Sequence, residues 1–154
     1  MVRKLKIICD SREKDPLFEG EDVVREKIDT GDYSLEGLKD EVSIERKSCA
    51  DLYGTLFHGH DRFKRELMRS QSLKYFAIVV EGGFTKTVSK RFNGAKYIEA
   101  SGETLRKIVE TITVKYNIHI IFCKDRDEAA TRIKGLLRAY ERINEKYLKE
   151  RVQK

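Results

Sequence analysis

Hydrophobic and polar positions change their period about one third of the way along the chain. In the first third, short apolar or alternating segments lie between turn residues, which is typical of β-strands. Val42–Lys47 shows this most clearly, because Val42 and Ile44 are apolar while Ser43 and Glu45 are polar. The other segments of this kind are Leu5–Cys9, Val23–Ile28 and Tyr33–Leu35. The first third therefore predicts a group of short strands.

After Lys47 the apolar residues recur at helical spacing. Ser48 is placed to cap a helix, with Asp51 in its first turn. Asp61–Ser70 predicts a charged helix, and another helix opens at Ser101. The longest predicted helix is Arg126–Lys149. Its apolar stripe consists of Ile133, Leu136, Leu137, Tyr140, Ile143 and Tyr147.

Two strongly apolar segments, Tyr75–Val80 and Ile118–Cys123, predict buried strands between these helices. A strand, a helix and a second strand in this order predict a parallel pair with a crossover connection. We therefore expect an α/β fold with a central mixed β-sheet and helices on both faces. The 154 residues fit one domain, which we expect to span residues 1–154.

The composition adds an excess of positive charge. Charged residues make up 38% of the chain, well above the usual quarter or so. The 32 basic and 26 acidic residues give a formal net charge of +6. Such an excess favours a polyanionic partner, although a highly charged solvated surface would give the same number. Thr85–Lys96 concentrates the charge, with four basic residues and no acidic one.

Several protein classes are excluded by the same sequence. No apolar run approaches the roughly 20 residues that span a bilayer. The basic N-terminus is followed by only a short apolar segment before Asp10, so we expect no signal peptide. The three cysteines are far apart and form no CxxC pair, which argues against a disulfide framework or a structural zinc site. We expect a cytoplasmic protein, associated with the nucleoid if its source is prokaryotic, and no membrane partner.

The candidate chemistry lies on the predicted hairpin that follows Asp32. Side chains alternate across a strand, so Glu45 and Lys47 share one face, and the hairpin brings Asp32 close to them. Two carboxylates can hold a hard divalent cation, and such an ion can polarise a phosphodiester and activate water. An ammonium group can stabilise the charge that develops. The alternative is a solvated, salt-bridged strand, because such triplets are common in a highly charged chain.

Two longer motifs decide between these alternatives. Gly31–Tyr33 followed by Glu45–Asp51 resembles the GDX(n)ERKX3D signature of the XPF/Hef structure-specific endonucleases. Cys9–Glu13 resembles the leading V-D-x-R-E segment of that family. The resemblance implies a restriction-endonuclease-like fold and Mg²⁺- or Mn²⁺-dependent cleavage of DNA, with flaps, forks and splayed arms as substrates in repair or recombination.

The resemblance also assigns roles to individual residues. Asp32 and Glu45 would be the principal metal ligands, with Glu13 and Asp10 in support. Lys47 would be the catalytic lysine and Arg46 would orient the site. Asp51 would fix the geometry of Arg46 and Lys47 from the helix N-terminus.

Partners follow from the charge pattern and the resemblance together. The candidate nucleic-acid-binding residues are Arg12, Arg62, Lys64, Arg65, Lys86, Lys90 and Arg91. Because the family often dimerises through late helices, Leu136, Tyr140, Ile143 and Tyr147 are candidates for a homodimer interface. We expect no helicase or helix-hairpin-helix domain within the 154 residues. An inactive DNA-binding or scaffold domain of the same fold, and a nuclease acting on RNA, remain alternatives.

Overall fold

We describe the protein from a computed structural model, which covers the backbone of residues 4–152 and the side chains of residues 4–145. Within these limits the chain forms six β-strands, five α-helices and one short 3-10 helix. In chain order they are β1 (Ile7–Asp10), β2 (Val23–Glu26), β3 (Tyr33–Leu35), β4 (Val42–Ser48), α1 (Cys49–Phe57), α2 (His60–Ser70), β5 (Tyr75–Glu81), α3 (Phe84–Val88), η1 (Ala95–Tyr97), α4 (Gly102–Tyr116), β6 (His119–Cys123) and α5 (Arg126–Val152).

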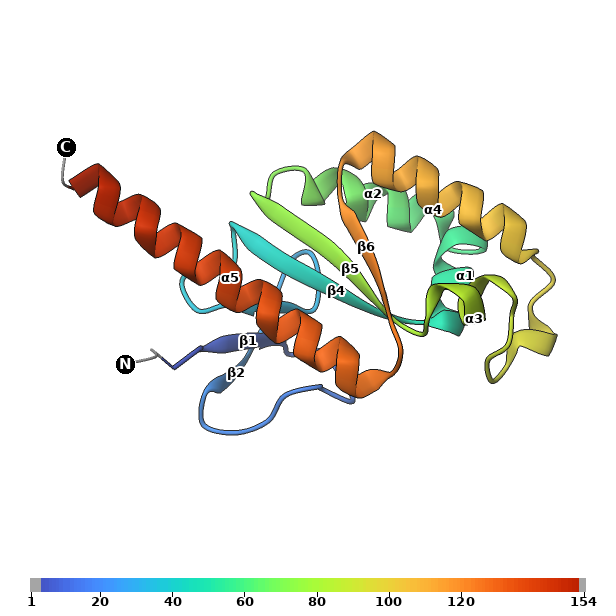
Figure 1. Cartoon of the computed structure of the whole chain (residues 1–154), viewed down its shortest axis with the longest axis horizontal. Helices are drawn as coiled ribbons and strands as arrows, with labels where there is room; N and C mark the ends of the chain where they lie inside the picture. The colour runs from blue at the N-terminus through green and yellow to red at the C-terminus, as the bar shows by residue number, and fades with distance from the viewer. Residues whose placement is uncertain (1–3, 153–154) are drawn as a thin grey trace.

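The strands form one mixed sheet in the order β2-β1-β3-β4-β5-β6 (Figure 1). β1 pairs in parallel with β2 and antiparallel with β3, which in turn pairs antiparallel with β4. β4, β5 and β6 are parallel to one another, and α4 connects β5 to β6. The predicted mixed sheet and the predicted parallel pair are therefore confirmed.

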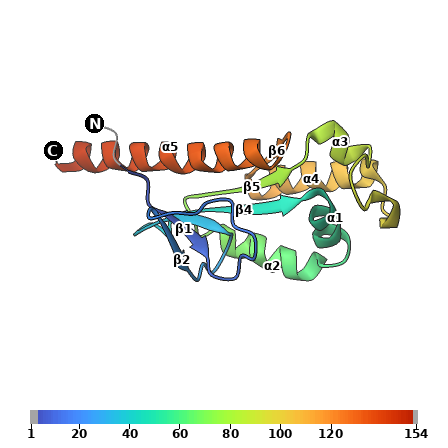
Figure 2. The same cartoon turned by 90° about the horizontal axis from the view of Figure 1, so that it is seen from below.

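The two faces of the sheet are covered by different helices. α5 lies along one face, while α1 and α2 lie on the other (Figure 2). On the α5 face, Ile133 and Leu137 pack against β4 residues Val42 and Ile44. On the other face, α1, α2 and α4 share a second core with β5. Because side chains alternate along β4, its apolar residues face α5 and Glu45 faces α2.

Besides small shifts at the ends of other elements, the observed structure differs from the predicted one at two places. The second strand ends at Glu26 rather than at Ile28, because the Ile28 amide leaves the sheet to donate to Asp10 Oδ1 at 3.0 Å. The basic segment Thr85–Lys96, in which no element was predicted, contains most of α3 and the start of η1. Both elements are short, so they produced no periodic signal in the sequence.

α5 extends beyond the sheet that it covers (Figure 1). Its first half is buried against the core, whereas Ile143 is 68% exposed. Across residues 4–152, none of the helices combines the length and the apolar character needed to span a membrane.

Candidate active site

The β3–β4 hairpin holds Asp32 in one position through its backbone and its carboxylate. The Asp32 amide donates to the Ile44 carbonyl at 2.9 Å, and the Asp10 amide donates to the Asp32 carbonyl at 2.8 Å. The Arg46 amide donates to Asp32 Oδ2 at 2.8 Å. Asp32 is therefore anchored to β1 and β4 at once, with its carboxylate at the end of β4.

Gly31 allows this arrangement because it has a positive φ of 91°. A Cβ at this position would lie 2.1 Å from Ser43 Oγ, and that hydroxyl is itself bonded to the Thr30 carbonyl at 2.6 Å. A side chain would be both strained and sterically blocked. The glycine therefore fixes the close approach of the two hairpin strands just before Asp32.

A cavity of about 520 Å³ opens at this end of β4, between the sheet and helices α1 and α2. Among the described residues, five acidic and three basic side chains line it. They are Glu13, Asp32, Glu45, Asp51, Glu66, Arg46, Lys47 and Arg62. The protein is basic overall, so an acidic excess here is a local departure from its charge. A cavity of this charge attracts cations rather than phosphates.

Glu45 is the most buried of these carboxylates, with 6% of its surface exposed. Burial raises the pKa of Glu45 well above its ordinary value, and the adjacent carboxyl groups of Glu66 and Asp32 raise it further. The nearest counterion is Lys47, whose Nζ lies 3.9 Å from Glu45 Oε2. The predicted placement of Glu45 and Lys47 on one face is thus observed. One ammonium at this distance does not neutralise three neighbouring carboxylates.

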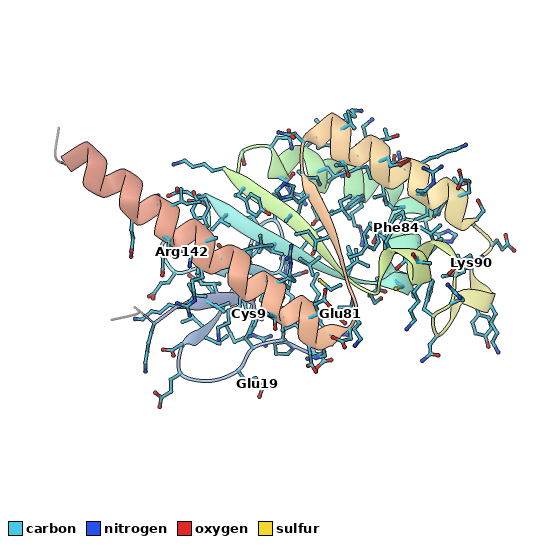
Figure 3. The ribbon with its side chains drawn as sticks, in the orientation of Figure 1. Cys9, Glu19, Glu81, Phe84, Lys90 and Arg142 are labelled. Carbon is cyan, nitrogen blue, oxygen red and sulfur yellow. The ribbon has the colours of Figure 1, made fainter. Side chains whose placement is uncertain are left out.

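Arg46 points away from Glu45 and connects several segments at the rim of the cavity. Its Nε donates to Glu81 Oε1 at the end of β5, and its Nη1 lies 3.3 Å from Glu13 Oε2 (Figure 3 labels Glu81). Burial lowers the pKa of Arg46, but the hydrogen bond and charge of Glu81 outweigh burial and raise it. Arg46 Nη1 also donates to the Asp15 carbonyl at 2.6 Å. Arg46 is therefore a fixed cation that joins the loop after β1 to β4 and β5.

Glu13 is placed by the same group of contacts. Its Oε2 accepts from the Tyr33 hydroxyl at 3.1 Å as well as from Arg46. Burial and then the charge of Asp32 raise the pKa of Glu13, and they outweigh Tyr33 and Arg46, which lower it. Glu13 thus lines the cavity with a carboxylate that faces Asp32.

Asp10 and Arg12 lie elsewhere than the sequence suggested. Asp10 is not among the residues that line the cavity, and both of its oxygens are engaged. Oδ1 accepts from the Ile28 amide and Oδ2 from Arg12 Nε at 2.9 Å. Arg12 Nη2 donates to the Ile28 carbonyl at 2.7 Å. These two residues therefore clamp the segment after β2 onto β1.

Asp51 lies at the first turn of α1 and reaches the cavity from an exposed position. Ser48 caps the helix as predicted, because its Oγ accepts from the Asp51 amide at 3.0 Å. Within residues 4–145, the Asp51 carboxylate makes no hydrogen bond with Arg46 or Lys47. Its position allows an electrostatic influence on the cavity rather than direct fixing of those side chains.

The candidate nucleic-acid-binding residues fall into two groups. Arg62 lines the cavity, and the neighbouring Lys64 lies on an apolar groove between α2 and α4. The second group follows β5, where Lys90 has a positive φ of 58° and donates from Nζ to the Ile98 carbonyl (Figure 3 labels Lys90). Lys90 therefore supports its own loop, whereas Lys86 and Arg91 are exposed there. Arg65 is an exposed residue of α2.

The four residues proposed for a dimer interface are in different surroundings. Leu136 packs against the core, and the Tyr140 hydroxyl donates to Glu41 Oε1 at 2.8 Å. Ile143 is exposed. Tyr147 lies outside the residues whose side chains are described. Ile143 is therefore the one of the four that the structure shows as an exposed apolar side chain.

Two residues of the site were not predicted from sequence, Glu66 and Glu81. Glu66 follows Phe63 by three positions and precedes Leu67 by one, so it lies beside the buried stripe of α2. Glu81 is paired in register with Ser48 at the end of β4, next to the signature. The sequence offered one signal for each residue. Glu66 is a carboxylate beside an apolar helical stripe, and Glu81 is a carboxylate at the end of a buried strand.

The donor chemistry of the cavity fits a hard divalent cation. All its anionic donors are carboxylate oxygens, the ligands that Mg²⁺ and Mn²⁺ favour. A buried carboxyl in contact with two others is stabilised by positive charge. In the described part of the chain, no three acidic, histidine or cysteine side chains converge as a formed metal site. Glu45, Asp32 and Glu66 instead share the lining of one cavity.

Comparisons with known proteins identify the family and the fold. Residues 10–136 match the sequence profile of the ERCC4 domain. The fold matches XPF from Aeropyrum pernix with 25% identity and a TM-score of 0.68, over 88% of this chain and 65% of that one. It also matches XPF from Aeropyrum pernix in complex with DNA, with 24% identity and a TM-score of 0.69, over 90% of this chain and 66% of that one. The chain thus spans slightly less than two thirds of each. No match was found among curated proteins.

Proposed function

The chain belongs to the ERCC4 domain family of XPF-type nucleases, and on this basis we propose that it is a divalent-metal-dependent DNA endonuclease. The observation that carries the proposal is the acidic cavity at the end of β4. There Asp32, Glu45 and Lys47 meet on a rigid hairpin, as hydrolysis of a phosphodiester requires. We propose branched DNA, such as flaps, forks and splayed arms, as the substrate.

Asp32 and Glu45 would hold the Mg²⁺ or Mn²⁺ ion, with Glu13 in support. When bound, the ion would polarise the phosphodiester and favour ionisation of water. We leave Asp10 out of the ligand set, because both of its oxygens are engaged within the fold. The supporting role of Glu13 rests on its facing Asp32 across the cavity.

Lys47 and Arg46 have separate tasks in this mechanism. Lys47 lies on the Glu45 face of β4, so its ammonium can approach the phosphate and stabilise its developing negative charge. Arg46 is held by Glu81 and Glu13, so it positions the carboxylates instead of contacting DNA. Asp51 is retained as a site residue that acts through its charge at the start of α1.

DNA would approach the cavity past Arg62 and the other basic residues of α2. One of the solved structures that this chain resembles is a complex with DNA. Lys64, Arg65, Lys86 and Arg91 are the remaining candidates for phosphate contacts, and each such contact makes the affinity salt-dependent. Lys90 and Arg12 contribute less directly in this proposal, because each donates to a backbone carbonyl of the chain.

We further propose that residues 1–154 act as one nuclease domain and form a homodimer through the late part of α5. Sedimentation at high protein concentration tests the dimer with wild type and an Ile143→Glu variant. The proposal predicts a wild-type dimer that the substitution disrupts. A monomeric wild type would overturn it.

The decisive experiment for activity compares wild type with Asp32→Ala and Lys47→Ala on flap, fork and linear duplex DNA. Each reaction is run with Mg²⁺, Mn²⁺ or EDTA. We expect cleavage of branched DNA by wild type with metal, and loss of cleavage in both variants with DNA binding retained. Cutting in EDTA, or undiminished cutting by both variants, would overturn the mechanism. Binding of DNA without cutting would indicate a scaffold domain instead.

A further inference from the structure

We propose that Glu66 is a further acidic residue of the cation-binding site, contributed by α2 rather than by the signature segments. The inference rests on the proposed function, because it concerns the same cavity. The signature residues come from the sheet, the loops beside it and the start of α1. Glu66 would add a carboxylate from a helix that lines another wall of the cavity.

The position of Glu66 on α2 sets it apart from the other charged residues of that helix. Throughout α2, which the structure describes in full, the other charged side chains are exposed, whereas Glu66 is half-buried. It lies beside Phe63 and Leu67, which are 4% and 2% exposed. The apolar contacts of α2 therefore hold the Glu66 carboxylate toward the sheet.

Glu66, Glu45 and Asp32 line the same cavity, and Glu45 is more than nine-tenths buried there. The carboxyl groups of Glu66 and Asp32 are close enough to add to the effect of burial in raising the pKa of Glu45. Like charges in such contact destabilise one another unless a proton or a cation lies between them. The geometry of the three residues therefore favours a bound cation.

The basic residues of the cavity do not provide this positive charge. Arg46 is committed to Glu13 and Glu81, and Lys47 reaches only Glu45, at 3.9 Å. Arg62, the third basic residue of the lining, is exposed and makes no ion pair within residues 4–145. Within residues 4–145, Glu66 makes no ion pair and donates or accepts no hydrogen bond with a basic or neutral side chain.

The absence of three converging ligands among the described residues is compatible with this role. Mg²⁺ usually keeps several water molecules and binds directly to one or two carboxylates. A further carboxylate beside the direct ligands, such as Glu66, would attract the ion by its charge without having to bind it directly. Substitution of a residue in such a position commonly weakens metal binding by about 10- to 100-fold.

The test measures Mn²⁺ binding to the whole chain without DNA, by isothermal titration calorimetry. Glu66→Gln removes the charge and keeps the shape of the side chain. The matched control is Asp61→Asn on the same helix, because the Asp61 side chain is 91% exposed and does not line the cavity. We expect about a 10-fold or larger increase in Kd for Glu66→Gln and no change for Asp61→Asn.

A second readout separates this role from damage to the fold. In EDTA, Glu66→Gln is expected to melt at a higher temperature than wild type, because one of three crowded carboxylates has become neutral. A Glu66→Gln protein with wild-type Mn²⁺ affinity would overturn the inference. Weaker Mn²⁺ binding would also overturn it if Glu66→Gln melts at a lower temperature than wild type and Glu66→Asp, which keeps the charge, shows the same loss. If wild type itself neither binds Mn²⁺ nor cleaves DNA, the proposed function fails as well. If wild type binds Mn²⁺ and cleaves DNA and Glu66→Gln binds Mn²⁺ equally well, only the role of Glu66 is overturned.

Discussion

Glu41 and Glu45 lie at the two ends of one short stretch of chain, yet their surroundings are opposite. Glu41 precedes β4 and accepts from the Tyr140 hydroxyl at 2.8 Å, with Lys74 Nζ 3.1 Å away. These two partners, Tyr140 first, lower the pKa of Glu41. Glu45 is buried against two carboxyl groups, and its pKa is raised. The fold supplies Glu41 with a hydrogen-bond donor and a counterion, whereas it places Glu45 near other carboxyl groups.

The difference distinguishes a carboxylate whose charge is satisfied within the fold from one that fits the proposed metal-binding role. The ionised form of Glu41 stabilises the native state, because α5 and the loop before β5 both supply partners for it. The ionised form of Glu45 destabilises the native state until positive charge arrives. Such unfavourable groups are concentrated at functional sites in proteins. The contrast between Glu41 and Glu45 can be tested by substitutions at these two residues and at their neighbours.

The largest expected effect is on catalysis. Asp32→Asn should reduce the rate of metal-dependent DNA cleavage by about 10²- to 10³-fold, the scale for removing one essential electrostatic group. The matched control is Glu41→Gln, which removes a carboxylate from the other end of β4 and should leave the rate within about twofold. Single-turnover cleavage of a fork substrate measures both. Equal losses in the two variants would show that the two ends do not differ in function.

The next effect is on stability without metal. The folded-state pKa of Glu45 is raised, so its contribution is present at low pH and is lost as pH rises through that pKa. Glu45→Gln has no proton to lose and therefore gains no buried negative charge as pH rises. It should therefore be more stable than wild type at pH 8 in EDTA by about 1 kcal/mol or more. Urea denaturation at pH 5 and pH 8 measures this, and a variant less stable at both pH values would contradict it.

A smaller effect with the opposite pH dependence is expected at Glu41. Tyr140→Phe removes the hydrogen bond to the Glu41 carboxylate and should lower the free energy of unfolding by about 1 kcal/mol at pH 7. The pKa of Glu41 is lowered in the folded state, so this contribution is present at neutral pH and lost as pH falls through the folded value. The two proteins should converge in urea denaturation at acidic pH. A gap that persists there would point to lost packing instead.

The smallest effect concerns the outer rim of the cavity. Arg126 Nη1 lies 2.7 Å from Asp15 Oδ2, and Nη2 donates to the Pro16 carbonyl at 3.0 Å. The Asp15 carbonyl is in turn bound by Arg46. Arg126→Ala should change the free energy of unfolding by less than about 1 kcal/mol, because the pair is exposed. It should still slow cleavage several-fold, whereas an exposed control, Lys134→Ala, should not.

The fold could be predicted from sequence where the pattern of buried residues gives a clear hydrophobic period. Val42–Lys47 alternates and Tyr75–Val80 is continuously apolar, and both are strands of the central sheet. The Ser48 cap was visible because its partner lies three residues away. Short elements such as α3 were missed because five residues are too few to show a helical period.

The site was predictable as far as its local motifs reach. Asp32, Glu45 and Lys47 belong to one hairpin, so spacing along the chain was enough to bring them together. Glu66 and Glu81 join the site by tertiary packing of α2 and β5, which no local spacing reports. Asp10 shows the converse. It lies next to the site in sequence, but the long-range hydrogen bond from Ile28 directs its carboxylate elsewhere.

The contact between Arg126 and the Asp15–Pro16 loop has a consequence for the order in which the protein matures. The loop carries the carbonyl that holds Arg46, yet its anchor is the first residue of α5, 111 positions later. Domains emerge from the ribosome N-terminal end first. The hairpin with its acidic signature is therefore synthesised well before the residue that secures its rim. A nascent chain that stops short of α5 carries every signature residue without the finished cavity, so the rim of the cavity is completed only late in synthesis.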